Sequence, residues 1–150
     1  MSKGTCASCL DFDVDKVVKS KEKLKPTWLQ KTDFVREFIH SQNLKLRTPD
    51  HNVIMKLKLN PSHGGKKILY WASTEKTDKS PLILDARKAY HHFENSGVAM
   101  VSPNGNVTVK IACPQLYKAK VENKDNNTTF FRHLHFVVEE SNTWGKQIYT

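Results

Sequence analysis

Long apolar segments are missing from this sequence. No hydrophobic run approaches the roughly 20 residues that a membrane-spanning helix requires. The stretch from Met1 to Cys6 does not begin a hydrophobic signal core either. These absences predict a protein that does not associate with membranes and that stays inside the cell, in the cytoplasm.

Familiar catalytic signatures are missing as well. The chain has no Ser-His-Asp order, no kinase signature and no paired-carboxylate spacing. Gly64-Gly65 lacks the neighbours of a phosphate-binding or dinucleotide-binding loop. The sequence therefore leaves open whether the chain is an enzyme.

Cysteine is scarce, with three residues in the chain. The number is odd, and an intracellular protein would keep these thiols reduced. Cys6 and Cys9 have C-x-x-C spacing, which suits half of a zinc site or a redox pair. No second C-x-x-C exists and no strand precedes the motif, so two incidental thiols in a tail are the favoured interpretation.

Positive charge is plentiful. The chain has 24 basic and 15 acidic residues, a formal net charge of +9. Such a surface attracts nucleic acid and other polyanions by releasing their counterions. Lysine outnumbers arginine, the residue that reads bases, so this binding would be non-specific and sensitive to salt.

The chain of 150 residues is long enough for a single domain with its own core. Residues 1–25 are predicted to form a flexible basic N-terminal tail, and residues 26–150 a single domain. Apolar residues at helical spacing predict a helix over about 27–42 that covers a sheet. These residues are Trp28, Leu29, Val35, Phe38 and Ile39.

The rest of the domain carries β-strand signals. Alternating apolar residues predict a hairpin over residues 53–72, with its turn at 60–65. Asn104-Gly105 between two apolar runs predicts a second hairpin over 98–113. The expected fold is mostly β with an N-terminal helix, an antiparallel β-sandwich.

Residues 130–138 are predicted to form one strand rich in aromatic and β-branched side chains. His133 and His135 would share one face, and Leu134 and Phe136 the other. Two neighbouring imidazoles form half of a site for zinc, copper or iron. The alternative is a pair of histidines on the solvent face of an amphipathic strand.

Two further segments carry a recognisable pattern. They are Gly105-x-Val107-x-Val109-x-Ile111-x-x-Pro114-x-x-Tyr117 and Arg132-His133-Leu134-His135-Phe136. Together they resemble the C-terminal half of the intradiol ring-cleavage dioxygenases. The resemblance covers about residues 96–138 and implies a β-sandwich with non-haem ferric iron held by two tyrosines and two histidines. It implies that His133, His135 and Tyr117 are metal ligands. The alternative for Tyr117 is a ring packed on the sheet with its hydroxyl in solvent.

The chain departs from the family in two places. No tyrosine occurs from Lys118 to Arg132, where the second tyrosine ligand is expected, and Tyr90 and Tyr149 are the remote substitutes. The family's arginine is replaced by Phe130. A three-ligand site with one open position could still hold iron or zinc.

The composition is rich in lysine and asparagine, and two other segments are Asn95-Ser96-Gly97-Val98 and Cys113-Pro114-Gln115-Leu116-Tyr117. In these features the chain more loosely resembles uncharacterised small proteins of large DNA viruses and of algae. This resemblance implies a viral source, in which case the virion is a second location. Two functions compete with a metal-binding, dioxygenase-like protein. One is a non-enzymatic basic accessory protein that binds nucleic acid or another polyanion, and the other is a homo-oligomeric structural module.

Overall fold

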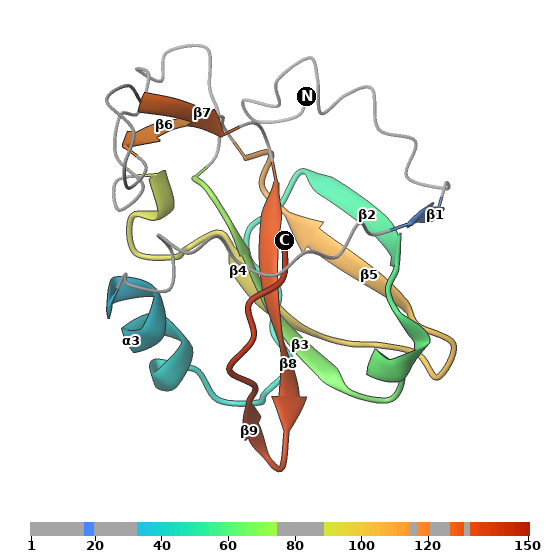
Figure 1. Ribbon diagram of the computed structural model, residues 1–150. Coiled ribbons are helices and arrows are strands. Elements are labelled where there is room, and N and C mark those ends of the chain that lie inside the picture. The colour runs from blue at the N-terminus through green and yellow to red at the C-terminus, as the bar shows by residue number, and fades with distance from the viewer. Residues whose placement is uncertain (1–16, 20–32, 75–88, 115–116, 121–126, 131–132) are drawn as a thin grey trace.

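The computed structural model describes residues 17–19, 33–74, 89–114, 117–120, 127–130 and 133–150. For 17–19, 117–120 and 127–130 it describes the backbone. In chain order the elements are β1 Val17–Lys19, α3 Asp33–Ser41, β2 Val53–Lys58, a short 3-10 helix Pro61–His63, β3 Lys67–Ala72, β4 Ser96–Met100, β5 Asn106–Ile111, β6 Tyr117–Lys120, β7 Asn127–Phe130, β8 Leu134–Glu140 and β9 Thr143–Trp144 (Figure 1).

The strands form two main sheets, as expected for a mostly β fold with one helix near the N-terminus. A three-stranded sheet has the order β1-β2-β5, a four-stranded sheet has the order β4-β3-β8-β9, and β6 pairs with β7 separately. All described pairings are antiparallel except that of β1 with β2. The two main sheets pack face to face, and the predicted antiparallel β-sandwich is confirmed.

One long pair of chain segments contributes strands to both sheets. β2 pairs with β5 in the first sheet, and β3 pairs with β4 in the second. Both connections turn the same corner between the sheets. There the Leu59 N–H donates to the Gly105 carbonyl at 2.9 Å, and the Val101 N–H donates to the Lys66 carbonyl at 2.9 Å. Residues 53–72 therefore run beside residues 96–111 on both sides of a shared bend.

The predicted hairpins over 53–72 and 98–113 are accordingly wrong. β3 is buried on both faces, so it needs hydrogen-bonded neighbours on both edges, and β4 and β8 supply them. Gly105 lies at the corner with a φ of +94°, and a Cβ there would lie 2.7 Å from the Leu59 carbonyl oxygen. The Asn-Gly signal thus marks a corner that requires glycine, not a hairpin.

The space between the two sheets is filled by side chains from both. Ile68 and Tyr70 of β3 and Phe136 and Val138 of β8 face residues of β2 and β5. The β2 and β5 members are Val53, Leu57, Val107, Val109 and Ile111. Alternation along each strand sends these residues inward, so every second residue of β5, at positions 107, 109 and 111, is buried.

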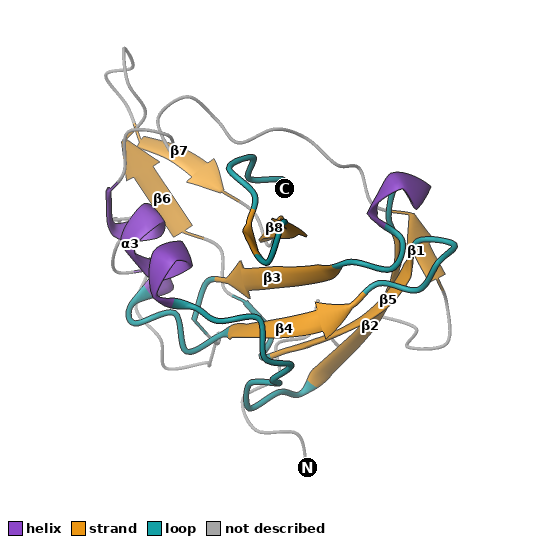
Figure 2. Ribbon diagram, turned by 90° about the horizontal axis from the view of Figure 1, so that it is seen from below, coloured by secondary structure: helices purple, strands orange, loops and turns teal. Residues whose placement is uncertain are grey.

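The opposite face of the four-stranded sheet is covered by α3 and by residues 89–93. Val35 and Phe38 of α3 pack against Leu69 and Trp71 of β3, and the rings of Phe38 and Trp71 meet edge-on at 5.7 Å. In Figures 1 and 2 the sheet accordingly lies between α3 and the β2–β5 pair. The covering helix is confirmed over residues 33–41, and 27–32 lie outside the described residues.

Asn95 connects the two sheets through hydrogen bonds. Its Nδ2 donates to the carbonyls of Ser73 at 2.8 Å and Ala112 at 2.9 Å, and its Oδ1 accepts from the Ala112 N–H at 2.9 Å. Asn95 is 4% exposed. One buried amide therefore joins the chain after β3, the chain before β4 and the chain after β5.

Three local predictions are changed. The expected strand over 130–138 is divided into β7 and β8. Val17–Lys19, inside the predicted tail, pair with Lys56–Lys58 because two β-branched residues extend the open edge of β2. Cys113, expected to be reduced, is disulfide-bonded, and its partner lies outside the described residues.

No helix in the described part of the chain is long and apolar enough to span a membrane.

Candidate metal centre

His133 directly precedes β8 and His135 is its second residue, on the sheet face that α3 covers. His135 is opposite Trp71 of β3 in the strand register. Val137, two residues further on, belongs to the core beneath α3, whereas Phe136 belongs to the core between the sheets. The predicted alternation of side chains is therefore confirmed.

The two imidazoles point toward each other. Their Nε2 atoms are 3.2 Å apart, and their ring centroids are 4.8 Å apart at an interplanar angle of 77°. The Tyr90 hydroxyl lies 3.0 Å from His135 Nε2 and 3.3 Å from His133 Nε2. Two imidazole nitrogens and one phenol oxygen thus form a nearly equilateral triangle.

Tyr90 reaches this triangle from the segment that precedes β4. Its side chain is fully buried, and its ring stacks on Phe93 at 5.8 Å and 10°. Sequence reasoning named Tyr90 as a remote substitute for a missing tyrosine and had no signal for its position. The fold supplies that position by passing residues 89–93 across the sheet face beside α3.

The other predicted tyrosines are placed differently. Tyr117 begins β6 and pairs with Phe130, which is three residues before His133 in the chain. The Tyr117 side chain lies outside the described part of the structure, so its role as a ligand stays a prediction. Tyr149 stacks on Phe136 at 5.2 Å and bonds to Gln147 Oε1 at 2.8 Å. Tyr149 therefore belongs to the other face of β8.

Burial keeps the His135 ring neutral. Its side chain is 3% exposed, and desolvation, with a smaller contribution from neighbouring His133, lowers its pKa from 6.5 to about 3. Its Nδ1 lies 2.8 Å from Thr150 Oγ1, and a backbone hydrogen bond to Tyr149 opposes the shift. A proton on Nδ1 satisfies this edge of the ring and leaves the Nε2 lone pair directed at Tyr90 and His133.

The triangle has the dimensions of one face of a metal tetrahedron. Ligand atoms bound to zinc at about 2.0–2.1 Å in tetrahedral geometry are separated by about 3.3–3.4 Å. The observed separations of 3.0, 3.2 and 3.3 Å lie close to this value. Three protein ligands would leave a fourth position for solvent or substrate.

Trp71 adds an unpaired donor beside the triangle. Its indole is fully buried and its ring centroid is 5.7 Å from that of His135, yet Nε1 has no hydrogen-bond partner among the described residues. An unpaired buried donor costs about 1–3 kcal/mol. The same core thus contains a donor suited to an acceptor bound nearby.

Other histidine and carboxylate side chains of the described residues do not join the site. In the described ranges, no three His, Cys, Asp or Glu side chains converge on a metal position. Glu139 instead accepts a hydrogen bond from the Lys67 backbone N–H at 2.8 Å. His91 is exposed and bonds to Glu94 at 2.5 Å. The third donor of the triangle is therefore the Tyr90 phenol and not a histidine, cysteine or carboxylate.

Comparisons with protein-family models, with curated proteins and with solved structures find no match for this chain.

Proposed function

We propose that this chain is a metal-binding β-sandwich protein in which His133, His135 and Tyr90 hold one iron or zinc ion. The convergence of three donor atoms within 3.0–3.3 Å of one another supports this proposal above all. The neutral state of His135 supports it further, because a metal ligand must offer a lone pair and not a proton.

The hydrogen bond at the other nitrogen of His135 suits a role as a metal ligand. A histidine that binds metal through one nitrogen usually donates its other N–H to an oxygen, which fixes the ring. Thr150 Oγ1 at 2.8 Å occupies that position for Nδ1. Tyr90 would bind as a phenolate, so metal binding would release its proton.

Iron supports a dioxygenase-like role as a second candidate. A phenolate is a hard anionic donor and favours ferric iron more strongly than softer donors do. The open fourth position would admit oxygen or substrate. Tyr117 pairs with Phe130 in the backbone register of β6 and β7, and its role as a second phenolate ligand stays a prediction from the resemblance. With Tyr90 alone, the donor set suits zinc or ferrous iron equally well.

A metal-free triad is the competing interpretation. The Tyr90 hydroxyl could donate to His135 Nε2 while a proton on His133 Nε2 is shared within the triangle. Such a network would stabilise the packing of residues 89–93 on β8 and bind no metal.

Calorimetric titration of the purified protein with zinc separates these interpretations. We expect one zinc ion per chain, accompanied by proton release. Tyr90→Phe keeps the ring that stacks on Phe93 and should weaken zinc binding by at least about tenfold. His133→Ala should abolish it, whereas His40→Ala removes an exposed histidine from α3 and should leave it unchanged.

Iron is tested by loading the protein anaerobically with ferrous iron and then oxidising the bound iron to the ferric state with air. A phenolate-to-iron absorption band that disappears in Tyr90→Phe would support the ferric candidate. If neither metal binds stoichiometrically to the folded wild-type protein, the metal proposal is wrong and the hydrogen-bonded triad remains.

A further inference from the structure

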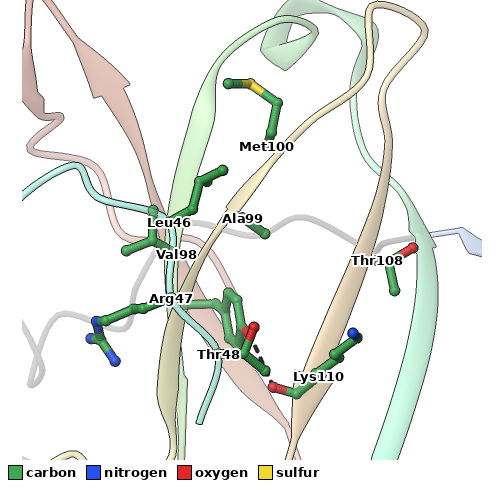
Figure 3. A pocket seen from close by; sticks show the side chains of 9 residues that line it. Leu46, Arg47, Thr48, Val98, Ala99, Met100, Thr108 and Lys110 are labelled. Carbon is green, nitrogen blue, oxygen red and sulfur yellow. Dashed lines mark hydrogen bonds between the residues drawn. The ribbon is translucent and has the colours of Figure 1, made fainter.

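A groove runs along the open side of the sandwich, between β4 and β5. It consists of two adjoining hollows of about 380 and 390 Å³ that share Ala99, Met100 and Thr108. Figure 3 shows Leu46 and Thr48, from the segment between α3 and β2, on one side of the first hollow. Thr108 and Lys110 of β5 lie on the other side. Tyr70 forms part of its lining and faces away from the histidines, since adjacent Trp71 points to the opposite side of β3.

The backbone of β4 presents a free edge to this groove. Val98 exchanges two hydrogen bonds with Arg47 on the outer edge, at 3.0 and 3.2 Å. Val101 donates instead to Lys66, on the β3 side. Because the direction alternates along a strand, the N–H and C=O of Met100 point outward like those of Val98. No described residue forms a hydrogen bond with this N–H or this C=O.

The side chains around this edge are apolar and basic. Met100 is 48% exposed and Leu46 is 53% exposed, unusually open for large apolar residues. The cationic members of the lining are Arg47, Lys56 and Lys110. Among the described residues, no aspartate or glutamate lines either hollow.

We propose that this groove binds an extended, acidic segment of a partner protein, which adds to the edge of β4 at Met100. The Met100 N–H and C=O pair with the segment's backbone, apolar side chains of the segment cover Met100 and Leu46, and its carboxylates approach Lys56 and Lys110. Charge complementarity and the free edge together define this occupant.

A nucleic acid fits these features less well. Single strands bind by stacking bases on exposed aromatic rings. Of the described residues that line the groove, Tyr70 alone is aromatic, and it is 2% exposed. The Arg47 guanidinium already donates to the Ser96 carbonyl at 2.8 Å, to Ser96 Oγ at 2.9 Å and to Gln42 Oε1 at 2.8 Å. It is therefore held along the sheet and not extended toward a phosphate.

The proposal is tested with a fluorescein-labelled ten-residue peptide of alternating glutamate and valine, followed by fluorescence anisotropy on the full chain. We expect binding that weakens as salt rises from about 50 mM to about 500 mM, and no comparable binding of a lysine–valine peptide. The charge-reversed pair Lys56→Glu with Lys110→Glu should lose at least about tenfold in affinity.

The matched control is Arg36→Glu with Lys146→Glu, which changes net charge equally on α3 and after β9, away from the groove. It should retain affinity within about threefold. Met100→Pro and Met100→Thr both remove the methionine side chain, but only proline removes the outward N–H, so Met100→Pro should bind at least about fivefold more weakly than Met100→Thr.

Three results would overturn the proposal. One is an equal loss of affinity for the glutamate peptide in the Lys56→Glu, Lys110→Glu variant and in the Arg36→Glu, Lys146→Glu control. The second is equal binding of the glutamate and lysine peptides, or no binding of either peptide. The third is single-stranded DNA that binds more tightly than the peptide and depends on the same two lysines, which would assign the groove to nucleic acid.

Discussion

Acidification should destabilise the metal-free protein through His135. In the folded chain the pKa of this buried ring is about 3, below the 6.5 of an unfolded histidine. Between these values the unfolded chain binds a proton that the folded chain does not. The contribution of His135 to stability is therefore fully present above pH 6.5 and is lost as the pH falls toward 3.

The size of the effect follows from the same two pKa values. Each pH unit between them removes about 1.4 kcal/mol from the free energy of unfolding. Moving from pH 7.5 to pH 4.5 should therefore remove about 3 kcal/mol, a large share of the 5–15 kcal/mol typical of a domain. Full burial of the ring makes solvent screening of this effect small.

Urea unfolding in the presence of a chelator at pH 7.5 and pH 4.5 measures it. Other groups also titrate in this range, so the informative quantity is the difference between wild type and His135→Gln, which cannot ionise. The wild type should lose about 3 kcal/mol more than the variant on acidification. His40→Gln on α3 should keep the wild-type dependence, because an exposed ring meets solvent in both states. Equal losses in wild type and His135→Gln would refute the reasoning.

Three substitutions test the packing that positions the site, each by the free energy of unfolding in urea. Asn95→Ala removes three buried hydrogen bonds and should cost roughly 2–4 kcal/mol; a loss below about 1 kcal/mol would deny it a cross-linking role. Phe38→Ala removes a ring stacked on Phe93 at 4.0 Å and should cost about 3–5 kcal/mol, against near neutrality for the exposed His40→Ala. Gly97→Ala places a Cβ against the Tyr70 hydroxyl and 2.9 Å from the Arg47 carbonyl oxygen, and should cost roughly 1–3 kcal/mol; an unchanged unfolding midpoint would show that these groups move aside freely.

The sequence could place His133 and His135 together because their relation is local. Side chains two residues apart on a strand share a face whatever the strand's neighbours are. Tyr90 could not be placed in this way, because it is 45 residues from His135 and approaches only through the path of 89–93 across the sheet. Thr150, which contacts the other side of the His135 ring, is likewise brought in by the fold.

Strand positions were also easier to predict than strand partners. Alternation in residues 53–59 and 107–111 indicates which side chains face the core. The structure buries these positions except for Met55, which is partly buried. It carries no information on which strand lies alongside. The turn at Asn104-Gly105 suggested the neighbour in sequence, whereas full burial of β3 required β4 and β8 on its two edges.

The corner shared by residues 59–66 and 101–105 has a consequence for how the molecule comes apart. Each sheet contains half of the same two chain segments, so peeling one layer away would pull on the strands that build the other. The layers should consequently lose their slowest-exchanging amide protons together and not one after the other. A ligand bound at β8 would then protect the amide protons of β5, in the opposite layer, from exchange as effectively as those of β3.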